Sequence, residues 1–136
     1  MFAHALIVSP LYVGLCALIF VVLSVRVIRG RGWRQVNLGH GGHADLETAI
    51  RVHANFAEYV PFSLLVIVLV EAAGFSRYWV HALGIALIVA RLAHAQGLGV
   101  AKQPSPGRIV GVTLTFAVLV IGGALLIWCF LRNVTL

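Results

Sequence analysis

Hydrophobic residues in this chain form four long runs that are separated by short polar breaks. The runs cover about residues 5–28, 46–73, 77–98 and 106–131. Each run has about 20 residues or more, and a helix of that length crosses roughly 30 Å of hydrocarbon. No run alternates as a strand does, and lipid accepts only helices or closed barrels. The pattern predicts an all-α fold: one integral membrane four-helix bundle over residues 1–136.

Capping residues mark the ends of these predicted helices. Ser9 and Pro10 supply an N-cap and a first-turn proline for the first helix. Asp45 is the residue type that caps a helix well, and it stands at the start of the second run. Gly30 and Gly32 lie among arginines and indicate the end of the first helix.

The composition excludes a water-soluble protein. Hydrophobic residues make up 61% of the chain and charged residues 10%, against roughly 45–50% and about 25% in soluble domains. Ten Lys and Arg against four Asp and Glu give a net charge of +6. A nucleic-acid binder needs its basic groups on one solvated face, whereas these are scattered between apolar runs. Membrane lipids or a small anionic ligand are therefore the expected partners, and nucleic acid is not.

The distribution of basic residues predicts an orientation in the membrane. Positive residues favour the cytoplasmic side of a membrane protein. Here they gather in the breaks after the first and third runs and at the adjoining run ends, at Arg26, Arg29, Arg31, Arg34, Lys102 and Arg108. We therefore expect both termini outside and the two basic loops in the cytoplasm.

The second run carries a dense group of polar side chains that a membrane helix does not need. Ionisable groups within membrane segments are costly and mark functional sites by default. Arg51, Asn55 and Glu58 stand at i, i+4 and i+7, so they project from one helix face. Pro61 follows and should bend the helix beside them. Within the same few residues the run also contains His53 and Tyr59.

The third run adds two further polar groups, Arg91 and His94, at i and i+3. Counting from the helix ends, Glu58 and Arg91 reach similar depths, so they are expected to neutralise each other. Such a pair can also serve only to fix helix register. The whole set nevertheless has more guanidinium groups than register requires. It predicts a polar cavity open to the cytoplasm, where arginines bind carboxylates and Glu58 holds an ammonium.

These residues resemble the motifs of a known family. The stretch from Arg51 to Pro61, RVHANFAEYVP, is similar to the second-helix motif of the MAPEG family, the membrane-associated proteins in eicosanoid and glutathione metabolism. The stretch ARLAHAQG around Arg91 and His94 resembles that family's third-helix motif. Arg108, followed by Gly111 and Thr113, fits its bacterial members. The resemblance extends over essentially the whole chain.

The resemblance implies a homotrimer in a bacterial inner membrane, with glutathione bound between neighbouring subunits near the cytoplasmic face. It implies that Arg108 is catalytic and stabilises the glutathione thiolate. The implied glutathione-binding residues are Arg31, Arg51, His53, Asn55, Glu58, Tyr59, Arg91 and His94. Members that make eicosanoids often have tyrosines where this chain has His94 and Leu98, which argues against leukotriene or prostaglandin synthesis.

The implied chemistry is physically reasonable. A thiolate is a far better nucleophile than a thiol. A guanidinium beside the sulfur favours the thiolate, because its positive charge lowers the thiol pKa. A thiolate at the membrane boundary meets apolar electrophiles dissolved in lipid. We therefore expect conjugation of glutathione to lipophilic electrophiles, or reduction of lipid hydroperoxides.

Three other interpretations remain open at this point. A small multidrug exporter also has four helices, but its key glutamate stands in the first helix, where this chain has no acidic residue. A haem or quinone protein could use His53 and His94 as opposed ligands. A family member could also keep the fold without the enzyme activity, or bind an anionic thiol other than glutathione. No metal or disulfide is expected, since Cys16 and Cys129 lack the spacing for either.

Overall fold

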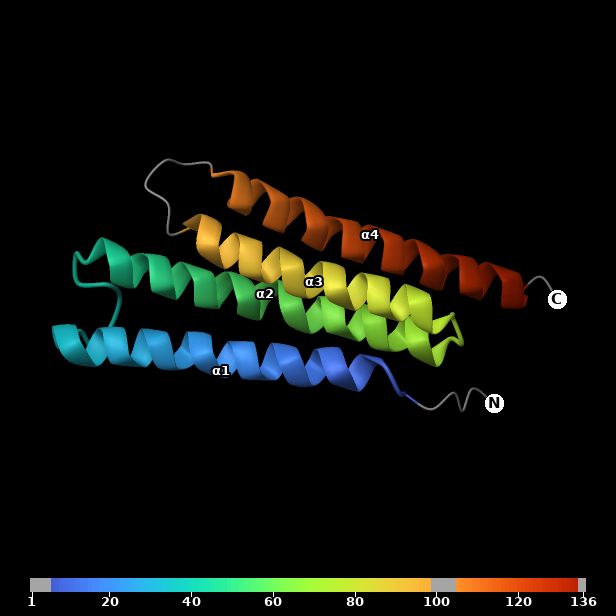
Figure 1. Ribbon diagram of the computed structural model, residues 1–136, viewed down its shortest axis with the longest axis horizontal. Coiled ribbons are helices and arrows are strands. Elements are labelled where there is room, and N and C mark those ends of the chain that lie inside the picture. Colours follow the sequence, from blue (N-terminus) through green and yellow to red (C-terminus); the bar gives the residue numbers. More distant parts are fainter. Residues whose placement is uncertain (1–5, 99–104, 135–136) are drawn as a thin grey trace.

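The computed structural model describes residues 6–98 and 105–134 of the chain. Over these ranges it contains four α-helices and no strand (Figure 1). They are α1 (Ser9–Arg34), α2 (Ala44–Ala72), α3 (Arg77–Leu98) and α4 (Pro106–Val134). All four are long and apolar enough to cross a membrane. This confirms the predicted all-α class and the four-helix membrane bundle.

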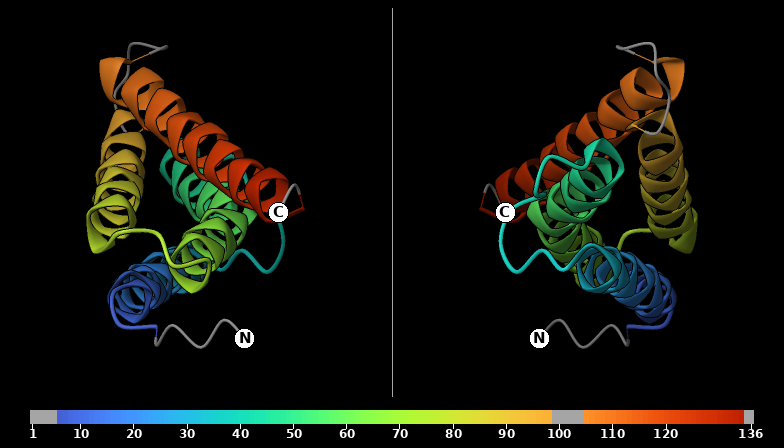
Figure 2. Two further views of the ribbon diagram at one scale, coloured as in Figure 1. Left: turned by 90° about the vertical axis from the view of Figure 1, so that its right-hand side faces the viewer. Right: turned by 90° about the vertical axis from the view of Figure 1, so that its left-hand side faces the viewer.

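The helices run alternately up and down, so the α1–α2 and α3–α4 connections lie at one end (Figure 1). We call this the loop end. The start of α1 and the end of α4 lie at the opposite end. Within the described residues α2 and α3 each contact all three other helices, whereas α1 and α4 do not touch each other, as the end-on views illustrate (Figure 2). The predicted loop residue Lys102 lies outside the described residues.

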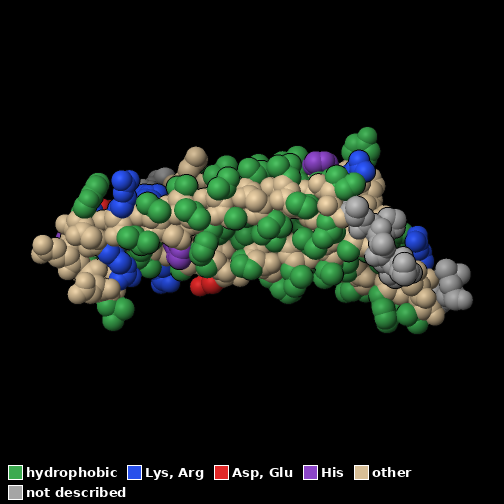
Figure 3. Space-filling view, turned by 90° about the horizontal axis from the view of Figure 1, so that it is seen from below, with side chains coloured by type: hydrophobic (Ala, Val, Ile, Leu, Met, Phe, Trp, Pro, Cys, Tyr) green, Lys and Arg blue, Asp and Glu red, His purple; other side chains and the backbone are tan. Residues whose placement is uncertain are grey.

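The four helices share an apolar core and present an apolar exterior. Branched aliphatic side chains from all of them are buried together, including Leu23, Ile67, Leu87 and Val118. Many large hydrophobic side chains on α1 and α4 are exposed instead. On the face drawn in Figure 3 hydrophobic side chains cover the middle of the molecule, and Lys and Arg side chains lie towards its ends. This arrangement suits lipid around the middle and water at both ends.

The first helix begins differently from the sequence expectation. Ser9 and Pro10 fall inside the first turn, Val8 occupies the N-cap position, and no side chain of the first helix caps it. The cap comes instead from Glu71 near the end of α2. One carboxylate oxygen of Glu71 accepts the backbone N–H groups of Ile7 (2.9 Å) and Val8 (2.7 Å), and the other accepts that of Ser9 (2.7 Å). A buried carboxylate thus satisfies donors that the helix start leaves open.

Replacing Glu71 with alanine should therefore destabilise the bundle. Three backbone N–H groups would lose their acceptor in a buried environment, and we expect a loss of about 2 kcal/mol. Thermal unfolding in detergent measures the effect. Glu47→Ala is the matched control, because Glu47 is an exposed carboxylate in the first turn of α2. Equal losses in the two variants would show that the Glu71 cap contributes nothing.

The α1–α2 connection corrects two further expectations. The first helix continues past Gly30 and Gly32 to Arg34, and Gln35 in the left-handed conformation ends it. Both glycines are therefore internal to the helix. Asp45 is not the N-cap of α2, which is His43. Asp45 instead forms an ion pair with Arg34 and so fastens the end of α1 to the start of α2.

Three glycines bring α3 and α4 close together at the loop end. A Cβ on Gly97 would lie 2.3 Å from the backbone nitrogen of Arg108, and one on Gly107 would lie 2.8 Å from the carbonyl oxygen of Ala93. A Cβ on Gly111 would lie 2.6 Å from the Cβ of His94. Only glycine allows this approach, as is common where membrane helices pack tightly. The contact fixes the start of α4 against the end of α3.

Candidate functional site

A polar groove opens between α2 and the α3–α4 pair near the loop end. It has a volume of about 390 Å³, within the range of small-molecule sites. The residues that line it are Arg51, Ala54, Asn55, Glu58, His94, Leu98 and Arg108. Five of these seven have polar side chains, which is unusual for a surface between apolar helices. We refer to this feature as the polar groove.

Helix geometry explains how α2 contributes most of the lining. Arg51, Asn55 and Glu58 are spaced at i, i+4 and i+7, and the polar groove contains all three, as the spacing predicts. The opposite side of α2 carries Val52, Phe56 and Val60, which are buried in the core. Burial of that apolar side turns the polar side away from the core and towards α3 and α4.

The other wall comes from the α3–α4 contact. His94 is buried, with 5% of its side chain exposed, and Gly111 packs against its Cβ position. Arg108 stands in the first turn of α4, where its backbone N–H donates to the Ser105 hydroxyl (3.3 Å). The Ser105 hydroxyl in turn donates to the carbonyl of Gly97 (2.6 Å). The glycine contact therefore places the Arg108 side chain at the groove.

The charges in the polar groove favour an anionic guest. Arg51 and Arg108 bring two guanidinium groups, and Glu58 brings one carboxylate. None of these three side chains forms an ion pair within the described part of the chain, where the one ion pair joins Arg34 and Asp45. The groups are exposed and free to bind a ligand. Two arginines can hold carboxylates, and the carboxylate can hold an ammonium.

Arg91 does not pair with Glu58, so that expectation is wrong. Its guanidinium donates to Asn55 Oδ1 (2.7 Å), to the carbonyl of Gly111 (3.2 Å) and to the Thr115 hydroxyl oxygen. Arg91 is 4% exposed and does not line the polar groove. Similar depth on two helices did not bring the side chains together, because the rotation of α3 directs Arg91 behind Asn55 and towards α4.

Tyr59 also lies beside the polar groove and not in it. Its ring is 5.9 Å from the Arg91 guanidinium carbon, within the range of a cation–π contact. Together with Asn55, Arg91 and Thr115 it lines a small cavity of about 30 Å³, which has room for about one water molecule. Tyr59 therefore lies beside Arg91, on the far side of Asn55 from the polar groove.

His53 and Arg31 lie on a different side of the molecule. His53 stands about 200° from Arg51 around the helix, and its Nε2 is 3.0 Å from the Ser24 hydroxyl of α1. Its ring stacks on Phe20 at 4.9 Å between centroids. Arg31 donates to the carbonyl of Asn37 (2.9 Å). Neither residue lines the polar groove of its own chain.

The same geometry contradicts a bis-histidine haem site. His53 faces α1, whereas His94 lines the polar groove on the other side of α2. Opposed imidazole ligands must face each other across a shared space. These two histidines are separated by the body of a helix. The described residues also contain no group of three or more metal-binding side chains.

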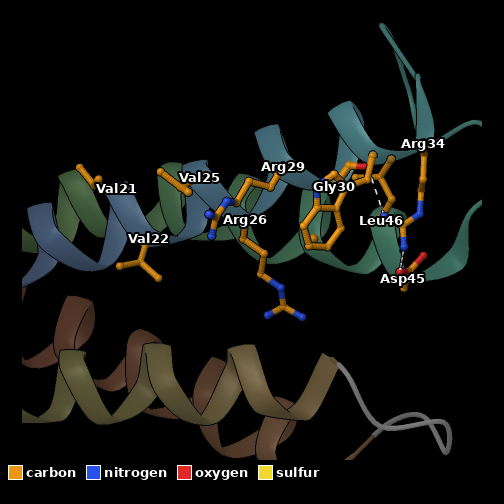
Figure 4. Close-up of a pocket in the computed structure, with 11 residues that line it drawn as sticks. Val21, Val22, Val25, Arg26, Arg29, Gly30, Arg34, Asp45 and Leu46 are labelled. Atoms are coloured by element: carbon orange, nitrogen blue, oxygen red, sulfur yellow. Dashed lines mark hydrogen bonds and ion pairs between the residues drawn. The ribbon is translucent and has the colours of Figure 1, made fainter.

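A second groove lies along α1 at the loop end and has a volume of about 510 Å³. Figure 4 shows Arg26 and Arg29 beside Val21, Val22 and Val25, with the Arg34–Asp45 pair closing one end. Apolar walls next to arginines match the boundary between acyl chains and phosphates, where long basic side chains reach out of the lipid. This groove is mostly apolar and lacks the convergent polar groups of the first.

The structure assigns roles in the site that the sequence analysis did not predict. Thr115 and the carbonyl of Gly111 hold Arg91, and Leu98 and Ala54 complete the lining of the polar groove. Glu71 was also missed, because its partners are backbone groups about 60 residues away in sequence. For the Arg91 contacts, the sequence offered one signal. Gly111 and Thr115 are spaced at i and i+4, which places both on one face of α4.

Comparison with known proteins agrees with the motif resemblance. The model of the MAPEG family matches residues 9–128. The chain is 39% identical over 90 residues to the inner membrane protein YecN of Escherichia coli K12, covering 66% of this chain and 69% of that protein. The YecN protein of Escherichia coli O6:H1 (strain CFT073) matches equally well. No solved structure matches this chain significantly.

Proposed function

The chain belongs to the MAPEG family, and from this premise we propose that it activates glutathione for attack on lipophilic electrophiles or hydroperoxides. The proposal places it in the bacterial inner membrane, where its YecN relatives are named as residing. It places both termini outside and the basic loop end in the cytoplasm. The functional unit is a homotrimer that takes glutathione from the cytoplasm and its second substrate from the lipid.

The observation that carries this proposal is the composition of the polar groove. Glutathione has two carboxylates, one ammonium group and a thiol. Arg51, Arg108, Asn55 and Glu58 offer two cations, an amide and one anion in a single groove of about 390 Å³. The guanidinium groups suit a carboxylate and the thiolate, the Asn55 amide suits the second carboxylate, and Glu58 suits the ammonium group. A transported hydrophobic compound would not need this set, which favours a peptide-like anion.

The chemistry assigns a separate role to Arg108. Its guanidinium stabilises the glutathione thiolate and leaves Arg51 to hold a carboxylate. The thiolate then attacks the electrophile, so that a sulfur–carbon bond forms as the leaving group departs with the bonding electrons. With a hydroperoxide, the sulfur attacks the outer oxygen and the alcohol leaves. A second glutathione then displaces hydroxide from the sulfenic acid and yields the disulfide.

A trimer accounts for His53 and Arg31, the two candidate residues on the α1 side of the molecule. His53 contacts Ser24 and stacks on Phe20, and Arg31 follows Phe20 by 11 residues, which returns to nearly the same face of α1. This side of α1 and α2 also carries an apolar groove of about 450 Å³ that includes Phe20 and Pro61. In our proposal it packs against the polar groove of the next subunit and supplies Arg31 and His53 to its glutathione.

Binding calorimetry with glutathione in detergent tests the proposal. Arg51→Ala should weaken binding roughly 30-fold, because it removes a charged hydrogen-bonding partner of a carboxylate. Arg29→Ala removes the same charge at the same end of the molecule, but from the second groove, and should change affinity little. If the wild-type protein takes up no glutathione, or if both variants bind like wild type, the assignment is wrong.

Sharing of the site between subunits has its own test. Arg31→Ala and Arg51→Ala should each weaken glutathione binding as pure proteins. When the two variants are co-expressed and purified together, some grooves with an intact Arg51 will face a neighbour with an intact Arg31. Those mixed trimers should recover part of the tight binding. An absence of recovery in verified mixed oligomers would show that no site is built from two chains.

A further inference from the structure

Arg91 is a buried cation whose partners are all uncharged. Only 4% of its surface is exposed, and it donates to Asn55 Oδ1, the Gly111 carbonyl and the Thr115 hydroxyl. No carboxylate pairs with it in the described ranges. A charge buried among neutral groups is costly. A role beyond packing is therefore the natural explanation for its position directly behind the polar groove.

The hydrogen-bond directions around Arg91 are fixed by chemistry. A guanidinium can only donate hydrogen bonds. Asn55 must therefore turn its carbonyl oxygen towards Arg91, at 2.7 Å. The Thr115 hydroxyl donates to the Gly111 carbonyl (2.7 Å) and keeps its lone pairs for Arg91. Every acceptor in this cluster is thus directed at the buried cation.

We infer that Arg91 is a positioning residue: it locks the Asn55 amide so that the NH2 group faces the polar groove as a fixed donor. The amide oxygen is held on the Arg91 side, and the NH2 group lies on the opposite branch of the planar amide. Rotating the amide by half a turn would set NH2 against the guanidinium and lose the bond. Asn55 lines the polar groove, whereas Arg91 does not.

This orientation determines which ligand groups the polar groove accepts. An unconstrained asparagine adapts to a donor or to an acceptor, but the locked amide offers only N–H groups. Together with Arg51 and Arg108 it forms a donor-rich wall, and Glu58 is left as the single acidic acceptor. The groove therefore selects a guest with carboxylate oxygens opposite Asn55 and rejects one whose carboxylates are masked. The identity of the guest as glutathione rests on the proposed function. The fixed orientation of the Asn55 amide rests on its contact with Arg91 alone.

The first experiment needs no ligand. The chain has three asparagines, Asn37, Asn55 and Asn133, so protein labelled with ¹⁵N-asparagine gives a simple side-chain amide spectrum in detergent. Asn55→Ala identifies the Asn55 signals. Arg91→Met should shift and broaden them and leave those of Asn37 and Asn133 in place, whereas Arg91→Lys, which keeps a donor, should restore a sharp signal. If Arg91→Met leaves the Asn55 amide unchanged, the inference is overturned.

The second experiment measures selectivity. Calorimetry compares glutathione with its diethyl ester, in which both carboxylates are masked. Arg91→Met should weaken glutathione binding roughly tenfold and reduce the preference over the ester. In an Asn55→Ala background the same replacement should cost little more, because Arg91 acts through Asn55. Equal losses in both backgrounds would refute that route.

Folding controls keep the test decisive. Thr115→Val removes another Arg91 partner and leaves the Asn55 contact intact, so it should preserve the Asn55 signals and the selectivity. If Arg91→Met does not fold, the Arg91→Lys and Thr115→Val pair still tests the inference. Loss of selectivity in Thr115→Val with retention of the Asn55 signals would contradict it. Should the wild-type protein bind no glutathione, the proposed function fails, and the amide spectrum decides the positioning role alone.

Discussion

Arg108→Ala should lower the rate of glutathione conjugation by roughly 10²–10³-fold, because the variant lacks the cation that stabilises the thiolate. The arginine lies in the first turn of α4 and lines the polar groove, free of any ion pair in the described residues. The loss should appear mainly in kcat, with a smaller change in KM for glutathione, because Arg51 still holds a carboxylate. Steady-state kinetics with a lipophilic aryl halide and glutathione provide the measurement.

Arg132→Ala is the control for that experiment, since Arg132 stacks on Trp128 at the opposite end of the molecule. It should leave kcat unchanged. Raising the pH should partly rescue Arg108→Ala, because hydroxide then supplies the thiolate that the guanidinium no longer favours. A wild-type protein that binds glutathione but shows no turnover with any electrophile would instead favour a family member that kept the fold without the activity.

Gly97→Ala should destabilise the protein by about 3 kcal/mol, the upper part of the range for overpacking. The added Cβ would lie 2.3 Å from the Arg108 nitrogen and 2.7 Å from the Gly107 carbonyl carbon. Both are backbone atoms, so no flexible side chain can move aside. The end of α3 and the start of α4 must separate, which also displaces Arg108 from the polar groove. Thermal unfolding and glutathione affinity should therefore both fall.

Gly123→Ala is the matched control for this packing test. Gly123 lies in the same pair of helices, in α4, and a Cβ there would meet no atom within 4 Å. Alanine also favours a helix over glycine, so its stability should stay equal or rise slightly. If Gly97→Ala unfolds at the same temperature as Gly123→Ala, the close α3–α4 contact does not hold in solution.

The sequence was sufficient for the fold because its hydrophobic runs are long and clearly separated. Hydrophobic runs of about 20 residues or more leave few structures in lipid other than membrane-spanning helices. Helix ends were harder to predict. Gly30 and Gly32 lie inside α1, since glycine permits a helix end without imposing one. The cap of α1 is Glu71, a contact that depends on how α1 packs against the end of α2.

The site was predictable where it depends on one helix and less so where it depends on several. The spacing of Arg51, Asn55 and Glu58 placed them on one face, and the structure brings them to one groove with His94 and Arg108. The partner of Arg91 depends on the rotation of α3, which depth alone does not determine. His53 is the opposite case, because two residues of helix already place it about 200° from Arg51 and therefore away from the groove-lining face.

A cryo-EM map of the protein in lipid nanodiscs with saturating glutathione tests the central claim most directly. We expect ligand density in the polar groove between α2, α3 and α4, with a carboxylate on Arg51 and the sulfur near Arg108. Density from the neighbouring subunit's Arg31 should close the site. An empty polar groove at saturating glutathione, or density for the peptide at any other place on the protein, would contradict the account.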